Sequence, residues 1–307
     1  MSVMRIVVVR GGALGDALLT IHPLAALRTC YGAATITCIG PRVLRSVGVV
    51  PWLVDRLIPI EDEGGWQLFR ATDLPTWLEC DIGVVWLQQW QHVADVLRQA
   101  GPSQVVAGPS LPPEGSSLHV VEHLFKILEP LDVTVSCARL PLPLAELSMQ
   151  KAGQCWRNLG LRPGKVVALH PGSGGLWKRL PRDYVEWLIE HCVYRGWQVL
   201  VLLGPAEEEE RAWWARWCIE KQSDIRLAPA MPIDVLAVLI ARCSLYIGCD
   251  TGPSHLAALT GVRCLVFFGP TDARRWRPWG PRVSILDSAG SWPPPQERTL
   301  QALERLA

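Results

Sequence analysis

The sequence lacks the features that define several large classes of protein. Its 307 residues carry a formal net charge of only +1, so no overall positive field exists to hold nucleic acid. No uncharged stretch reaches the ~18 residues that a membrane-spanning helix needs. The opening residues have neither the basic start nor the small-residue cleavage site of a signal peptide. We therefore expect a cytoplasmic protein that does not bind nucleic acid.

The ten cysteines form no recognisable metal or disulfide pattern. None stands in a C-x-x-C pair, and several lie inside apolar runs, such as Cys38 and Cys264. In such runs cysteine packs as a small hydrophobic residue. We interpret the cysteines as reduced thiols of the core.

One short stretch matches a zinc-protease pattern. Residues 119–123 read HVVEH, which fits H-x-x-E-H. A zinc site of that kind needs a further ligand on a suitable fold, and this stretch lies on a helix with an apolar face. We interpret the helix as structural and expect no metal.

Short apolar runs alternate with longer helical stretches along the chain, which is typical of a parallel sheet covered on both faces. The predicted strands cover residues 5–10, 34–40, 55–60, 81–87, 103–108, 165–170, 197–204, 244–250 and 263–269. A proline-rich connector at 139–145 predicts two Rossmann-like domains, 1–140 and 146–307. Separately, the last helix could pack back on the N-terminal domain. Ligands on such sheets bind beyond the carboxyl ends of the strands, so we expect function in a central cleft faced by both sheets.

The first glycine loop, RGGALGD (10–16), follows the first predicted strand. It is not a G-x-G-x-x-G fingerprint, and no acidic residue follows the second strand to bind a ribose. A dehydrogenase is therefore disfavoured. Asp16 could cap the helix that follows.

Two further loops have the chemistry of a phosphate cradle. HPGSGGLWKRLP (170–181) offers backbone N–H groups, Ser173 and Lys178, although a flexible surface loop is an alternative interpretation. IGCDTGPSHL (247–256) ends a strand and begins a helix, whose N-terminus and His255 could hold an anion. Asp250 or Thr251 could instead act only as a cap. Three such loops at strand ends favour a nucleoside diphosphate ligand.

Several stretches together resemble glycosyltransferase family 9, the ADP-heptose:lipopolysaccharide heptosyltransferases. They are RGGALGDALLTIHPLAALR, HPGSGGLWKRLP, LLGPAEEEER, AMPIDVLAVLIARCSLYIGCDTGPSHLAA and FFGPTD. The resemblance implies an α/β protein of GT-B fold that needs no metal or other cofactor. It also implies inverting transfer of a heptose-type sugar from an ADP-sugar, bound by the C-terminal domain, to a lipid-linked glycan such as the lipopolysaccharide core.

The resemblance also implies a role for individual residues. Asp16 corresponds to the catalytic base, and Lys178 to the cation that balances charge on the leaving diphosphate. The donor-binding residues would be Ser173, Gly174, Glu208 (ribose), Met231 (adenine), Asp250, Thr251, Gly252 and His255, and the acceptor side would include Arg10, Gly12 and Gly15.

Other readings of the same residues stay open. The chain could use another nucleotide sugar or another acceptor, because its N-terminal domain is not rich in Lys or Arg. It could also be a non-catalytic nucleotide-sugar-binding protein. A lipid-linked acceptor would bring the chain into peripheral contact with the inner membrane, although the sequence has no dedicated membrane anchor.

Overall fold

The computed structural model describes residues 3–70, 78–135, 140, 142–221, 224–288 and 290–306. The chain divides into two compact units, Met1–Pro143 and Leu144–Ala307. The division falls inside the proline-rich connector expected at 139–145, of which positions 139 and 141 lie outside the described residues.

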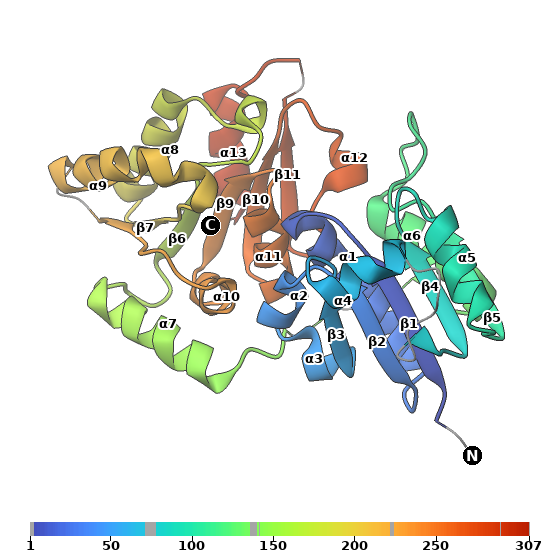
Figure 1. The fold of residues 1–307 in the computed structure, drawn as a ribbon. Helices are drawn as coiled ribbons and strands as arrows, with labels where there is room; N and C mark the ends of the chain where they lie inside the picture. The colour runs from blue at the N-terminus through green and yellow to red at the C-terminus, as the bar shows by residue number, and fades with distance from the viewer. Residues whose placement is uncertain are drawn as a thin grey trace. The chain divides into compact units, whose positions relative to one another are not determined.

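The first unit is built on a parallel five-stranded sheet (Figure 1). Its strands, in the spatial order β3-β2-β1-β4-β5, are β1 (Arg5–Arg10), β2 (Thr35–Gly40), β3 (Arg56–Pro59), β4 (Ile82–Trp86) and β5 (Gln104–Gly108). The described helices are α1 (Leu14–Cys30), α2 (Val43–Ser46), α3 (Val49–Trp52), α4 (Glu63–Trp66), α5 (Gln91–Gln99) and α6 (Val120–Leu128), with 3-10 helices η1 (Gln67–Phe69) and η3 (Glu129–Leu131). Because the strand order reverses between β1 and β4, their carboxyl ends flank a topological switch point.

Strand β1 is buried along nearly its whole length, as its continuous apolar run predicts for a sheet covered on both faces. Val7 and Val9 belong to a core cluster with Val93 and Leu97 of helix α5. Alternate residues of a strand point to opposite faces, so Arg10 points away from that cluster. Its guanidinium bonds Thr20 of helix α1.

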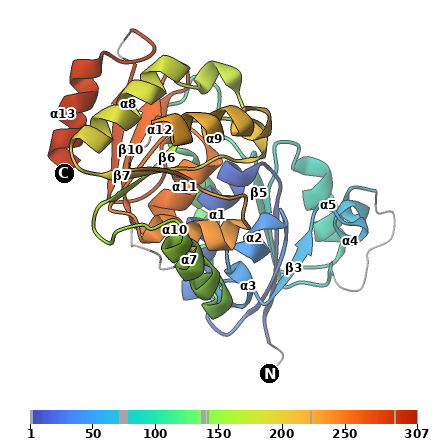
Figure 2. The ribbon, with the colours of Figure 1, turned by 90° about the vertical axis from the view of Figure 1, so that its left-hand side faces the viewer.

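The second unit holds a parallel six-stranded sheet (Figure 2). Its strands, in the spatial order β11-β10-β9-β6-β7-β8, are β6 (Val166–His170), β7 (Gln198–Val201), β8 (Ile225–Leu227), β9 (Leu245–Cys249), β10 (Arg263–Phe268) and β11 (Val283–Asp287). The described helices are α7 (Glu146–Asn158), α8 (Arg182–Tyr194), α9 (Arg211–Glu220), α10 (Ile233–Ala241), α11 (Gly252–Thr260), α12 (Ala273–Trp276) and α13 (Gln296–Leu306), with 3-10 helices η4 (Leu176–Lys178) and η5 (Pro205–Glu210). Its switch point lies between β6 and β9.

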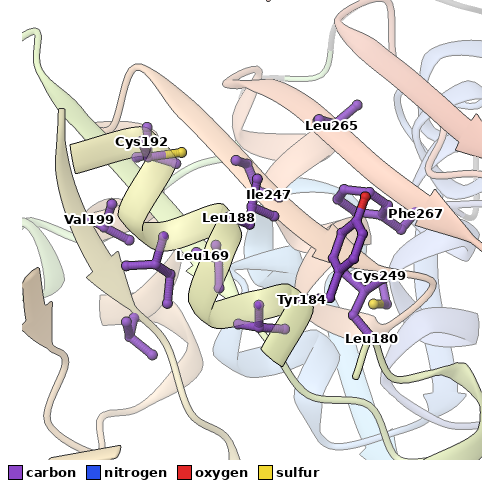
Figure 3. Close-up of a cluster of buried hydrophobic side chains, with 14 of the residues drawn as sticks. Leu169, Leu180, Tyr184, Leu188, Cys192, Val199, Ile247, Cys249, Leu265 and Phe267 are labelled. Carbon is purple, nitrogen blue, oxygen red and sulfur yellow. The ribbon is translucent and has the colours of Figure 1, made fainter. Parts of the chain in front are cut away.

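One face of the second sheet packs against helix α8 (Figure 3). Leu188 of α8 lies over side chains from the central strands, including Leu169 and Ile247. Tyr184 packs its ring edge-on against Phe267, with ring centroids 6.3 Å apart. This packing fixes the central strands, and therefore the loops that follow them, on a rigid base.

The last helix packs on the second sheet, and that it could also pack back on the N-terminal domain stays a prediction. Ala302 and Leu303 of α13 pack against the same core cluster as α8, and Figure 2 shows the two helices side by side. The hydroxyl groups of Tyr184 and Thr299 form a buried hydrogen bond of 2.6 Å between them. The helix therefore covers one face of its own unit.

The cysteine prediction is confirmed for most of the described residues. Among the nine described cysteines, which are all free thiols, six are buried. Burial raises the pKa of Cys38 and Cys264 to about 12, so these thiols stay protonated at neutral pH. Cys30 is exposed and is an exception, and Cys137 lies outside the described residues.

Candidate functional site

Lys178 and Asp250 meet at the switch point of the second sheet. Lys178 ends η4, in the loop after β6, and Asp250 directly follows β9. The two strands are neighbours, so the loops beyond their carboxyl ends come together. Lys178 Nζ donates to Asp250 Oδ2 at 2.8 Å, with the Lys178 side chain 24% exposed and the Asp250 side chain 8% exposed. The cation therefore stays accessible to a ligand.

Helix α11 begins directly after Asp250. Thr251 is its N-cap residue with extended backbone, and neither Thr251 nor any other side chain caps the helix by a hydrogen bond within the described chain. Thr251 thus holds the N-cap position without the side-chain hydrogen bond that a capping residue would make. The first N–H groups of a helix lack helical acceptors and carry the positive end of its dipole. His255 lies in the first turn, with its Nε2 atom 4.0 Å from Asp250 Oδ1.

Asp250 therefore contacts the groups that would hold an anion. One of its oxygens accepts from Lys178, and the other lies near the ring of His255. A carboxylate repels an incoming phosphate, so we interpret Asp250 as the residue that orients its two neighbours. That Asp250 itself binds the donor stays a prediction.

The glycine loop after β6 forms hydrogen bonds within itself and to Arg179, which follows it. Ser173 is buried, and its hydroxyl oxygen accepts from the Gly175 N–H at 3.3 Å. Its carbonyl oxygen accepts from Arg179 Nε at 2.9 Å. Within the described residues no acceptor bonds the N–H groups of Ser173 and Gly174, so both remain for an anion.

The predicted ribose and adenine residues lie in other loops of the same unit. Glu208 belongs to η5, after β7, and its side chain is 65% exposed with one oxygen accepting from Arg211 Nε at 3.0 Å. Met231 is half-buried just before helix α10. Both side chains are reachable from solvent.

Sequence reasoning missed the neighbouring acid, Glu207, which is buried in the same loop region. Its Oε2 atom accepts from the Gly204 N–H at 2.9 Å and lies 3.4 Å from Nε2 of His170, the last residue of β6. Its Oε1 atom accepts from Arg179 Nη2 at 3.4 Å. Glu207 stands three residues after the N-cap residue Gly204, which is a capping-box position, and that spacing could have identified it.

Acid is expected to destabilise the second unit through Glu207. Burial alone would raise the pKa of Glu207, but the His170 hydrogen bond and charge, the Gly204 N–H and Arg179 together hold it below its ordinary value of 4.5. The group binds its proton less readily in the folded state than in the unfolded state. Its contribution to the free energy of unfolding is therefore complete above pH 4.5 and is lost as the pH falls through the lower folded pKa.

The measurement is the melting temperature of the wild type and of Glu207→Gln from about pH 7 down to about pH 3. The wild-type value should fall more steeply at the acid end, because the variant lacks the titrating carboxylate. Parallel profiles would contradict this prediction.

In the first unit, Asp16 lies in the first turn of α1 beside the end of β1. Its Oδ1 atom accepts from Arg10 Nη2 at 3.3 Å, and its Oδ2 atom accepts from the Ala13 N–H at 3.0 Å. The expected helix cap is thus confirmed, together with an ion pair. The Arg10 side chain is 2% exposed and that of Asp16 is 25% exposed. Arg10 also donates to Thr20 Oγ1 at 3.0 Å and to the carbonyl oxygen of Trp86, at the end of β4, at 3.5 Å.

The glycines of this loop make room for Asp16. Gly12 has a φ of +121°, and a Cβ atom there would lie 2.6 Å from the Cβ atom of Asp16. Only glycine tolerates both the conformation and the contact. Gly15 lies in the first turn of α1, next to Asp16.

The HVVEH stretch is a helix start. His119 is the N-cap of α6, its Nδ1 atom accepts from the Val121 N–H, and Glu122 accepts from the His119 N–H. His123 Nε2 bonds the carbonyl oxygen of Pro109 at 2.8 Å. The structural interpretation of this helix is therefore confirmed.

In the part of the chain that the structure describes, no helix is both long and apolar enough to cross a membrane. Over the same residues, no group of three or more His, Cys, Asp or Glu side chains is arranged to hold a metal ion.

Comparison with known proteins gives matches over most of the chain. The family model described as glycosyltransferase family 9 (heptosyltransferase) matches residues 110–306. Lipopolysaccharide heptosyltransferase 3 of Escherichia coli K12 is 30% identical over 170 residues, which are 52% of this chain and 47% of that protein. The chain thus spans about half the length of the curated relatives it matches.

Solved structures match the whole fold at low sequence identity. The structure of a family 9 glycosyl transferase from Veillonella parvula has a TM-score of 0.81 at 19% identity, covering 100% of this chain and 98% of that one. E. coli ADP-heptose lipopolysaccharide heptosyltransferase II has a TM-score of 0.77 at 19% identity, covering 99% and 98%. The predicted fold class, α/β with two parallel sheets as in GT-B heptosyltransferases, is confirmed.

Proposed function

Because the chain belongs to glycosyltransferase family 9, we propose that it moves a heptose-type sugar from an ADP-sugar to a hydroxyl group of a lipopolysaccharide core or a similar glycan. The transfer would invert the anomeric carbon and need no metal ion. The observation that carries the proposal is the accessible Lys178, held by Asp250 at the start of helix α11. The named E. coli relatives, which act in lipopolysaccharide assembly by their names, support this choice of donor and acceptor.

On the donor side, the diphosphate would lie against Lys178, the α11 N-terminus and His255. As the bond between the anomeric carbon and the ADP oxygen breaks, negative charge grows on the leaving diphosphate. A preformed ammonium and unbonded N–H groups stabilise that charge without moving. These groups would supply the positive charge that a metal ion supplies in other transferases.

On the acceptor side, Asp16 would act as the general base. The acceptor oxygen attacks the anomeric carbon from the face opposite to the leaving diphosphate and passes its proton to a carboxylate oxygen of Asp16. Arg10 and the Ala13 N–H hold that carboxylate in one orientation. Gly12 and Gly15 would let the acceptor approach the loop closely.

Other parts of the donor would meet other loops of the second unit. We assign the ribose hydroxyls to Glu208, whose exposed carboxylate Arg211 orients, and the adenine to Met231. The N–H groups of Ser173, Gly174, Thr251 and Gly252, for which the described part of the chain provides no acceptor, would bind phosphate oxygens. A lipid-linked acceptor would bring the chain into peripheral contact with the inner face of the membrane.

The test begins with nucleotide binding to the purified chain in EDTA. ADP at 100 times its Kd should add about 2.7 kcal/mol of stability, which raises the melting temperature by several degrees. UDP, GDP and NAD at the same concentration should raise it far less. A stronger effect of UDP would point to another nucleotide sugar, and stabilisation by NAD alone would overturn the donor assignment.

The second part of the test is transfer itself. With ADP-heptose and a lipopolysaccharide core acceptor, the chain should release ADP and add one heptose to the glycan, seen by mass spectrometry. The new bond should have the anomeric configuration opposite to that of the donor. ADP binding without any transfer would favour a nucleotide-sugar-binding protein instead.

A further inference from the structure

Three loops of the second unit are tied together beside the candidate donor site. They are the glycine loop after β6 (171–178), the loop and 3-10 helix after β7 (204–210), and the segment around Trp292 before α13. Two side chains make most of the connections between them, Arg179 and Glu207. Neither has a part in the proposed chemistry.

Arg179 connects all three loops. Its Nε atom donates to the carbonyl oxygen of Ser173, and its Nη2 atom donates to the carbonyl oxygen of Ala206 at 3.0 Å. Its Nη1 atom donates to Glu210 Oε1 at 2.7 Å. Its own carbonyl oxygen accepts from Trp292 Nε1 at 3.0 Å. One planar guanidinium therefore sets the distance between the glycine loop and η5.

Glu207 contacts the glycine loop after β6. Its carboxylate joins His170, the Gly204 N–H and Arg179, so both oxygens of this buried group are used. A Cβ atom at Gly172 would lie 1.9 Å from Glu207 Oε1. The backbone of the glycine loop therefore rests directly on the Glu207 carboxylate.

The position of this loop determines the position of the donor groups. Ser173 and Gly174 carry the unbonded N–H groups, and Lys178 immediately precedes Arg179 in the chain. Arg179 points to the loops while Lys178 points to Asp250. A displacement of about 1 Å in groups that hold a reacting ligand can cost about 100-fold in rate.

We propose that Arg179 and Glu207 are positioning residues that hold the glycine loop in the geometry that binds the donor diphosphate. This inference rests on the proposed function for the identity of the ligand. The link between the two side chains and the loop is independent of that identity. The experiment therefore measures both ADP binding and the effect of these side chains on the loop.

The first measurement is ADP affinity by calorimetry at a temperature where every variant is folded. Glu207→Gln keeps the shape of the side chain but loses its charge, and it should weaken ADP binding about tenfold, or about 1.4 kcal/mol. Arg182→Gln is the matched control, because Arg182 donates to Glu210 of the same cluster at 3.5 Å and, among the described residues, forms no hydrogen bond with the glycine loop. It should bind ADP as the wild type does. A merely structural role for Glu207 would lower the melting temperature and leave the affinity unchanged.

A double-mutant cycle tests the contact at Gly172. In the wild type, Gly172→Ala must displace Glu207 and should weaken ADP binding as much as Glu207→Ala does. In the Glu207→Ala background the added methyl group has room and should cost little more. Additive effects of the two substitutions would overturn the proposed contact.

Hydrogen exchange without any ligand separates the two proposals. The amides of Gly175, Lys178 and Arg179, which have acceptors in the structure, should exchange faster in Glu207→Gln than in the wild type and in Arg182→Gln. If the wild type binds ADP and Glu207→Gln binds it within twofold, the positioning role is wrong and the proposed function stands. If the wild type binds no ADP, the proposed function is wrong. In that case, equal exchange rates in the wild type and Glu207→Gln would also show that Glu207 does not hold the glycine loop in place. Faster exchange in Glu207→Gln would show that Glu207 holds the loop, which would then bind a different ligand.

Discussion

Replacing Lys178 with alanine is expected to weaken ADP binding at least tenfold and to lower kcat by about 100- to 1,000-fold, the usual effect of removing one preformed group that stabilises developing charge. Lys178 is the accessible cation at the switch point of the second sheet. Its removal also leaves the mostly buried carboxylate of Asp250 without its main counter-charge. That carboxylate would then repel the diphosphate.

Two further variants make this prediction specific. In the Lys178→Ala background, Asp250→Asn should recover part of the lost affinity, because it removes the repulsion. Lys165→Ala is the control, since Lys165 is an exposed lysine just before the opposite end of strand β6. It should change neither binding nor turnover. If Lys178→Ala binds ADP and turns over as the wild type does, the donor site has been assigned to the wrong residues.

Replacing Asp16 with asparagine is expected to lower kcat by about 100- to 10,000-fold, the range for loss of a general acid–base group. The ADP affinity should not change, because the groups assigned to the donor all belong to the second unit. Asparagine keeps the size of the side chain but cannot take the acceptor proton. The measurements are single-turnover transfer from ADP-heptose and calorimetry with ADP.

The control for Asp16→Asn must lower the melting temperature in the same way as Asp16→Asn does. Asp16→Asn removes the counter-charge of the buried Arg10 and should lower the melting temperature. Thr20→Val removes another hydrogen-bond partner of Arg10 and leaves the Asp16 carboxylate in place. It should lower the melting temperature with little loss of kcat. Equal losses of kcat in the two variants would mean that Asp16 acts only through Arg10.

The sequence predicts well those strands whose own residues form a continuous apolar run. RIVVVR and KVVALH are continuous apolar runs, and both form central strands of parallel sheets. The two strands that were missed, β8 (Ile225–Leu227) and β11 (Val283–Asp287), are the edge strands of the second sheet. Strand β8 has three residues and β11 is only partly buried, so neither has the apolar run that a buried strand needs.

The candidate site was predictable only in part, for a related reason. The phosphate-suited loops are local features, so Lys178 and Asp250 could be selected separately. Their ion pair joins residues 72 positions apart and depends on β6 lying next to β9. Which of the four consecutive glutamates is buried also depends on the tertiary structure. Glu207 is buried and Glu208 is exposed, although the two side chains are chemically identical.

The two ion pairs at the two switch points have opposite polarity toward solvent. In the first unit the cation, Arg10, is buried and the anion, Asp16, is partly exposed. In the second unit the anion, Asp250, is buried and the cation, Lys178, is partly exposed. In each pair the buried residue orients the exposed residue, and because it is buried it does not compete with that residue for a ligand. In the proposed reaction, the exposed carboxylate of the first unit would accept the acceptor's proton, and the exposed ammonium of the second unit would stabilise the departing diphosphate. Reversing either pair would present its own reaction partner with a charge of the wrong sign.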